Sequence, residues 1–107
     1  MGYDFSGYHR KTDEESIFWT HCMYAYEPVF KQCFGKEISL FSGRVTKDKI
    51  KDFKKGLDIF KSNPNNNRDY EQFPNDISNI TYTQLCKDLS KLLELMENKE
   101  VCYLYIW

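Results

Sequence analysis

Two histidines and four cysteines are the residues best suited to metal binding or nucleophilic chemistry: His9, His21, Cys22, Cys33, Cys86 and Cys102. A structural zinc site needs such ligands in short-spaced pairs, and this sequence contains no CxxC pair. A cysteine and a histidine can still meet in space as nucleophile and base, but no flanking signature singles out one cysteine. The sequence therefore predicts no metal site, no cofactor and no catalytic residue, and the chain is predicted not to be an enzyme.

Paired carboxylates are the other obvious source of chemistry, and three of them adjoin at Asp13, Glu14 and Glu15. They follow Thr12 in a pattern typical of the first turn of a helix, where a hydroxyl caps an amide and acids face the positive end of the dipole. This position already accounts for their residue types. We therefore interpret them as exposed acids that can contact a partner.

A second acidic group lies in residues 62–79, a stretch rich in asparagine and proline that is predicted to be a long loop. Loops of this length in small domains are commonly functional or disordered. Here carboxylates alternate with aromatic rings, which combine charge steering with large contact area. The predicted partner-binding residues are Asp13, Glu14, Glu15, Asp69, Tyr70, Glu71, Phe73 and Asp76.

Charge is unevenly distributed along a chain whose formal net charge is only −1. Residues 1–30 hold five acids and two bases, residues 31–61 nine bases and four acids, and residues 62–107 seven acids and four bases. The basic segment includes residues 47–61, where Ile50, Phe53, Leu57 and Phe60 make one apolar stripe of an amphipathic helix. Thr46 is predicted to cap this helix. Its lysines could follow a phosphate backbone, although aromatic residues that bind single strands usually lie within the basic groove.

The elements that hold these residues are predicted from their periodicity. Leu85, Leu89, Leu92, Leu93 and Met96 form the apolar face of a helix that begins near Thr81, and residues 101–107 form an uncharged run that we interpret as a buried strand. Further helices are predicted over 13–26, 29–34 and 47–61, and a strand over 37–45. Tyr3, Phe5 and Tyr8, in an N-terminal arm of residues 1–11, suggest another strand.

These elements predict a single α+β domain over residues 1–107, with about three main helices packed on a small, mostly antiparallel sheet that includes the C-terminal strand. Residues 1–16 are polar and acidic, so no signal peptide is predicted, and no segment is apolar and long enough to span a membrane. The cysteines form no compact framework. We therefore expect reduced thiols and a cytoplasmic protein.

Taken together, these features favour a small protein-binding inhibitor of the immunity or antitoxin type. Such a protein neutralises a basic toxin, which could be a nuclease, by covering its active cleft with an acidic, aromatic surface in a one-to-one complex. Two alternatives stay open. One is a nucleic-acid-binding or regulatory module that uses the basic helix 47–61, although nucleic acid is the less favoured partner. The other is a small enzyme or adaptor with a spatially assembled site.

Overall fold

The chain folds around a four-stranded sheet in the computed structural model, which describes residues 2–23, 26–62 and 82–107. The strands are β1 (Gly2–Tyr8), β2 (Phe18–Met23), β3 (Gly43–Arg44) and β4 (Tyr103–Ile106). They are arranged in the order β2-β1-β4-β3, and every neighbouring pair is antiparallel. The N-terminal segment is therefore a central strand of the sheet, which confirms the prediction of a strand there.

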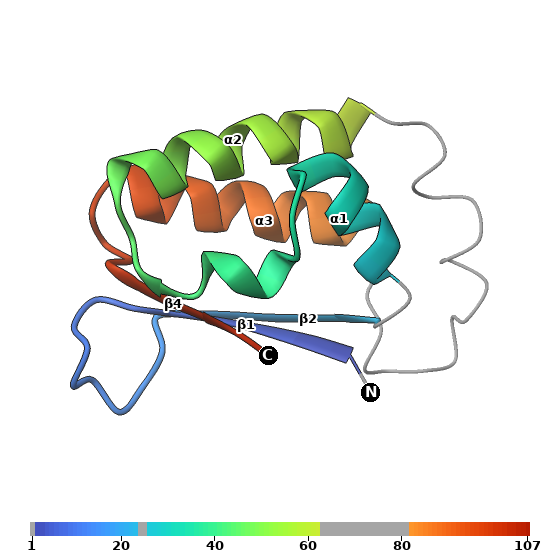
Figure 1. The fold of residues 1–107 in the computed structure, drawn as a ribbon. Helices are drawn as coiled ribbons and strands as arrows, with labels where there is room; N and C mark the ends of the chain where they lie inside the picture. Colours follow the sequence, from blue (N-terminus) through green and yellow to red (C-terminus); the bar gives the residue numbers. More distant parts are fainter. Residues whose placement is uncertain (1, 24–25, 63–81) are drawn as a thin grey trace.

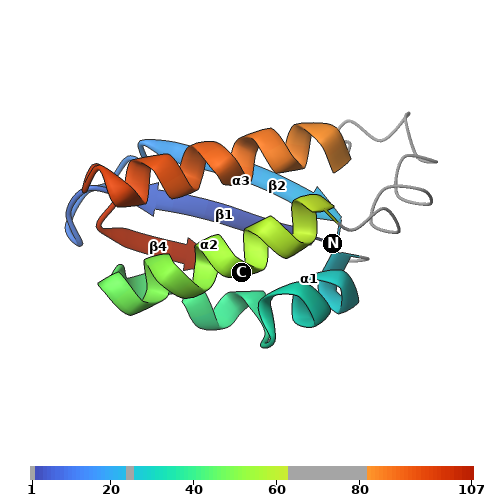
Figure 2. The same ribbon diagram turned by 90° about the horizontal axis from the view of Figure 1, so that it is seen from above.

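The helices all lie on one face of this sheet, as Figures 1 and 2 show from two directions. They are α1 (Glu27–Phe34), the short 3₁₀ helix η2 (Ile38–Phe41), α2 (Lys47–Ser62) and α3 (Tyr82–Glu97). This arrangement confirms the predicted α+β class, with three helices and an antiparallel sheet that contains the C-terminal strand. None of the helices in the described ranges is long and apolar enough to cross a membrane.

The core between the two layers is built mainly from aromatic rings and leucines. Phe30 of α1 packs edge to face on Phe5 of β1, with ring centroids 6.0 Å apart, and lies 5.4 Å from Phe60 of α2. The predicted apolar face of α3 is buried as expected: Leu85, Leu89, Leu92, Leu93 and Met96. Each aromatic ring removes a large apolar area from water, so a chain of this length can hold a stable core.

Local signals set the ends of α1 and α2. Thr46 Oγ1 accepts a hydrogen bond of 3.2 Å from the backbone N–H of Lys49, so Thr46 caps α2 as predicted. Pro28 lies in the first turn of α1, where its missing N–H costs no helical bond, and Gly35 ends that helix in the left-handed conformation at φ 75°. The predicted helical segment 29–34 is thus confirmed as part of α1.

The predicted helix over residues 13–26 is wrong. Residues 18–23 form β2 instead, and the preceding acids belong to the loop that joins β1 to β2. The backbone N–H of Arg10 donates to Asp13 Oδ2 at 2.9 Å, while Asp13 N–H donates to the Arg10 carbonyl oxygen at 3.1 Å. These two hydrogen bonds close a turn, although the sequence pattern of Thr12 followed by acids also suits the start of a helix. Aromatic and β-branched residues in 18–20 then favour extended backbone.

Two further predictions need correction. The strand predicted over residues 37–45 is reduced to Gly43–Arg44, because Ile38 and Phe41 are buried in the single turn of η2. The C-terminal run was expected to be a buried strand, but only one side of it is covered. Leu104 and Ile106 point into the core, whereas Tyr105 and Trp107 are exposed. The predicted loop 62–79 lies, apart from Ser62, outside the described residues.

Candidate functional site

The sheet face turned away from the helices, here called the open face, carries most of the exposed aromatic rings. No helix of the described residues covers it, and in Figure 1 it is the underside of the sheet. Strand alternation and the antiparallel register place nine of the described side chains on it. They are Asp4, Ser6 and Tyr8 of β1; Trp19 and His21 of β2; Arg44 of β3; and Tyr103, Tyr105 and Trp107 of β4 and the residue after it.

The rings of the open face lie on either side of short β1 side chains. In the register, Ser6 is opposite Trp19 on one side and Tyr105 on the other. Trp19 is 60% exposed and Tyr105 37%, yet Ser6 between them is only 3% exposed. The larger neighbours must therefore overlie Ser6. Asp4 and Ser6, the short β1 side chains of the open face that lie between these larger neighbours, are here called the β1 row.

Contacts between the rings fix the orientation of several of them. The rings of Trp19 and His21 are stacked, with centroids 6.3 Å apart and an interplanar angle of 19°. Tyr8 and Tyr105 meet edge to face at 5.6 Å. Trp19 and His21 are neighbours along β2, whereas Tyr8 and Tyr105 pair across β1 and β4. Because such contacts restrict side-chain rotation, these rings are partly ordered before any partner binds.

Two polar side chains at one end of the face, Asp4 and His21, form a hydrogen-bonded pair. His21 Nδ1 lies 3.0 Å from Asp4 Oδ1, and both side chains are partly buried. A carboxylate that orients an imidazole is also a feature of acid–base catalysis. In the described part of the chain, however, this is the only hydrogen bond of the His21 ring, so no nucleophilic side chain there is hydrogen-bonded to the imidazole. The pair is better suited to binding than to proton transfer.

The sequence-predicted acids are only partly placed by the structure. Glu14 and Glu15 are exposed in the loop between β1 and β2, near the Tyr8 end of the open face, and Asp13 is half-buried in its turn. The other predicted partner-binding residues, Asp69, Tyr70, Glu71, Phe73 and Asp76, lie outside the described residues. The same loop also contains Arg10 and Lys11, so its charge is mixed.

The basic helix of the sequence is confirmed as α2, but its lysines are remote from the open face. Lys47, Lys51, Lys54 and Lys55 are exposed on a helix of the opposite layer (Figure 2). The sheet therefore separates the lysines of α2 from the rings of the open face. A single ligand strand cannot stack on the rings and contact these lysines at one site.

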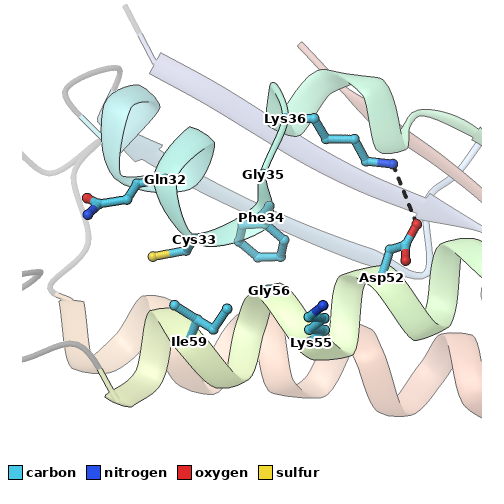
Figure 3. Close-up of a pocket in the computed structure, with 9 residues that line it drawn as sticks. All are labelled: Gln32, Cys33, Phe34, Gly35, Lys36, Asp52, Lys55, Gly56 and Ile59. Atoms are coloured by element: carbon cyan, nitrogen blue, oxygen red, sulfur yellow. Dashed lines mark ion pairs between the residues drawn. The ribbon is translucent and has the colours of Figure 1, made fainter.

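A groove of about 390 Å³ lies between the end of α1 and the middle of α2 on the helical side (Figure 3). Cys33, Phe34, Gly56 and Ile59 supply its apolar lining. At its rim Lys36 Nζ lies 3.8 Å from Asp52 Oδ2, so these two charges offset each other. Figure 3 shows no convergence of acid, base and nucleophile in this groove.

The thiols and histidines do not assemble a chemical centre. None of the four cysteines forms a disulfide, and burial raises the pKa of the Cys22 thiol to about 12, which keeps it protonated and unreactive at neutral pH. His9 Nδ1 bonds the Glu100 carbonyl oxygen at 3.1 Å. Across the described ranges, no three His, Cys, Asp or Glu side chains come together as a metal site requires.

Sequence reasoning missed the exposed rings that dominate the open face, chiefly Trp19, Tyr105 and Trp107. A signal for two of them was present in residues 103–107, where aromatic residues alternate with Leu104 and Ile106 at the strand period of two. No protein-family model, curated protein or solved structure matches this chain. Its function must therefore be argued from its own surfaces.

Proposed function

We propose that this chain is a small protein-binding module that uses the open face as its interface. One observation carries the proposal: Trp19 and Trp107, each 60% exposed, lie with Tyr105 on a sheet face that no described helix covers. Tryptophan and tyrosine are the residues that most often dominate binding energy at protein interfaces. A contiguous exposed apolar surface of this kind marks an interaction site more often than an inert surface.

The arrangement of charge favours a protein over a nucleic acid as the partner. A stacking platform for single strands combines its aromatic rings with cations in one groove. Here the lysines of α2 lie in the opposite layer, and Arg44 lies at the β3 edge of the open face, opposite Tyr103. The charged group between β2 and β4, at the end of the β1 row, is the carboxylate of Asp4. A negative charge beside the rings repels phosphate, but it suits a partner that brings basic side chains.

The specific form that we propose is an inhibitor of the immunity or antitoxin type, acting on a basic toxin in a one-to-one complex. Asp4 within the face, and Glu14 and Glu15 in the adjoining loop, would speed encounter with a positive cleft by long-range attraction. The rings would then fill the cleft and exclude water. We place this activity in the cytoplasm, because four cysteines that form no disulfide suit a reducing compartment.

Co-expression of the chain with its neighbouring reading frames tests this function. We expect a stable one-to-one complex with a basic protein. Replacing both Trp19 and Trp107 by Ala should weaken the complex by at least about a hundredfold, since each hot-spot ring contributes roughly 2 kcal/mol or more. Leu40→Ala is the matched control, because Leu40 is equally exposed, at 59%, but belongs to η2 rather than to the open face.

Two results would overturn the proposal. Loss of the complex on Leu40→Ala, with the double tryptophan variant unaffected, would move the interface to the helical side. Recovery of the chain with nucleic acid alone would favour the alternative function, a nucleic-acid-binding module that uses α2. In that case binding should fall steeply with salt, and it should disappear when Lys51, Lys54 and Lys55 are changed to Glu.

A further inference from the structure

The β1 row of the open face has a carboxylate, Asp4, at one end. The backbone N–H of Asp4 donates to the Trp107 carbonyl oxygen at 2.8 Å, and Trp107 N–H donates back to Asp4 at 3.1 Å. These reciprocal bonds place the two side chains directly opposite each other on the same face of the sheet. On the other flank, Asp4 is opposite His21, which stacks on Trp19. The carboxylate thus lies between an indole on β4 and an imidazole–indole pair on β2.

The Asp4 carboxylate is positioned to accept further hydrogen bonds. Its Oδ1 accepts the bond from His21 Nδ1, which orients the group, and its side chain remains 29% exposed. No hydrogen bond to Oδ2 comes from any residue in the described ranges. An ionised carboxylate accepts up to about four hydrogen bonds, so this one keeps most of its capacity for a ligand.

We propose that the Asp4 carboxylate and the indoles beside it form a subsite for a basic side chain of the partner, with arginine preferred over lysine. The inference rests on the proposed function, because it names the chemistry that a protein partner must bring to the open face. A guanidinium group can donate to the free oxygen of Asp4 while its flat surface stacks on the exposed indole of Trp19 or Trp107. A lysine ammonium can form the ion pair but lacks the planar face.

Charge and shape both select this occupant. A phosphate or carboxylate at this subsite would face the Asp4 carboxylate at short range, which costs free energy for like charges. An apolar side chain would remove that carboxylate from water without offering a hydrogen bond in return. A cation beside the rings satisfies the carboxylate and gains from an aromatic face. The subsite therefore matches the basic toxin surface that the proposed function requires.

The two tryptophans of the chain, Trp19 and Trp107, make the subsite directly observable by intrinsic fluorescence. We would titrate the wild-type chain with a hexa-arginine peptide at physiological salt and use hexalysine and hexaglutamate as comparison probes. We expect saturable change in tryptophan emission with hexa-arginine, weaker binding of hexalysine and no response to hexaglutamate. Asp4→Asn should weaken hexa-arginine binding by about tenfold or more, which corresponds to the loss of one ion pair near aromatic rings.

Matched variants separate the subsite from general charge attraction. Glu14→Gln removes the same charge from the adjoining loop and should change hexa-arginine affinity less than threefold. Trp19→Leu keeps an apolar strand residue but should remove the preference for hexa-arginine over hexalysine. Circular dichroism of each variant checks that the fold is retained. Equal affinity of the wild type and Asp4→Asn, or an equal response to hexaglutamate, would overturn the subsite.

Failure of the subsite and failure of the proposed function give different results. If a captured protein partner binds Asp4→Asn as tightly as wild type, the arginine subsite is wrong and the protein-binding function stands. If co-expression captures no protein, but hexa-arginine binding depends on Asp4 and Trp19, the subsite stands and the inhibitor function fails.

Discussion

Changing Gly56 to Ala tests the packing of α1 against α2, and the structure reverses the usual expectation for such a change. In an ordinary helix interior, Ala is about 1 kcal/mol more favourable than Gly. Here a Cβ on residue 56 would overlap the ring of Phe34, at 2.6 Å from Cγ and 2.7 Å from Cε1. Real carbon contacts of this kind do not occur below 3.0 Å, so the ring or the helix must move.

The Phe34 ring has little room to move away. It packs on Phe53 with centroids 5.3 Å apart, on Phe41 at 5.7 Å and on Phe30 at 6.0 Å. Extra atoms in such a core cost roughly 1–3 kcal/mol, and the overlap here puts the cost at the upper end. After the gain of about 1 kcal/mol from helix propensity, we expect Gly56→Ala to destabilise the fold by about 2 kcal/mol, which lowers the Tm by roughly 10 °C.

Urea unfolding followed by far-ultraviolet circular dichroism measures this change. Lys55→Ala is the neighbouring control, because it is exposed on the same helix and should alter the free energy of unfolding by less than about 0.5 kcal/mol. In a Phe34→Leu background the added methyl group has space. Gly56→Ala should therefore cost at least about 1 kcal/mol less there than in the wild type. A higher urea midpoint for Gly56→Ala in the wild-type background would refute the α1–α2 packing described above.

Three further predictions concern the sheet and the end of α3. The pKa of Cys22 is raised to about 12 by burial, so the unfolded chain loses this proton first. Stability should then fall by about 1.4 kcal/mol per pH unit from pH 9 towards 12, and comparative unfolding of Cys22→Ala should show a shallower decline. Thr20→Val removes the 2.7 Å bond from Thr20 Oγ1 to Asp88 Oδ2 and should cost about 1–3 kcal/mol by urea unfolding; a cost below 0.5 kcal/mol would contradict that bond. Lys99 has φ 61°, so Lys99→Gly should raise the Tm by a few degrees, corresponding to about 1 kcal/mol, whereas a lower Tm would contradict that backbone geometry.

The sequence predicted the elements in which one periodicity dominates. Leu89 and Leu92 lie on the buried side of α3, and Phe53 and Phe60 on that of α2, because a 3.6-residue repeat over four turns has no competing interpretation. The cap at Thr46 was predicted for the same reason: a hydroxyl just before an amphipathic run has few other roles. These helices, with the C-terminal strand, were enough to predict the α+β class.

The helix over residues 13–26 was predicted from two local signals, the capping hydroxyl of Thr12 and the acids that follow it. The interactions that determine the actual structure are instead tertiary. The sequence Thr12–Glu15 suits a capping box, but Asp13 instead closes a turn with Arg10. Thr20, which is polar, is buried because it bonds Asp88 of α3, whereas the apolar Trp19 is exposed. In β2 a polar side chain is therefore buried and an apolar one is exposed. The strand cannot be recognised from its hydrophobic pattern unless the partner helix is known.

The same exchange of polar and apolar positions explains why the candidate site was not predicted. Aromatic residues were counted as core or as anchors on a loop, but Trp19, Tyr105 and Trp107 are exposed on the sheet. If these rings served only the stability of the fold, we would expect them on the inner face of the sheet, where the core would bury them. Retaining two exposed indoles beside an oriented carboxylate is costly for solubility in a protein that acts alone. A partner protein that covers the open face would remove this cost while it is bound. For this physical reason we propose that function lies on the sheet and not on the basic helix.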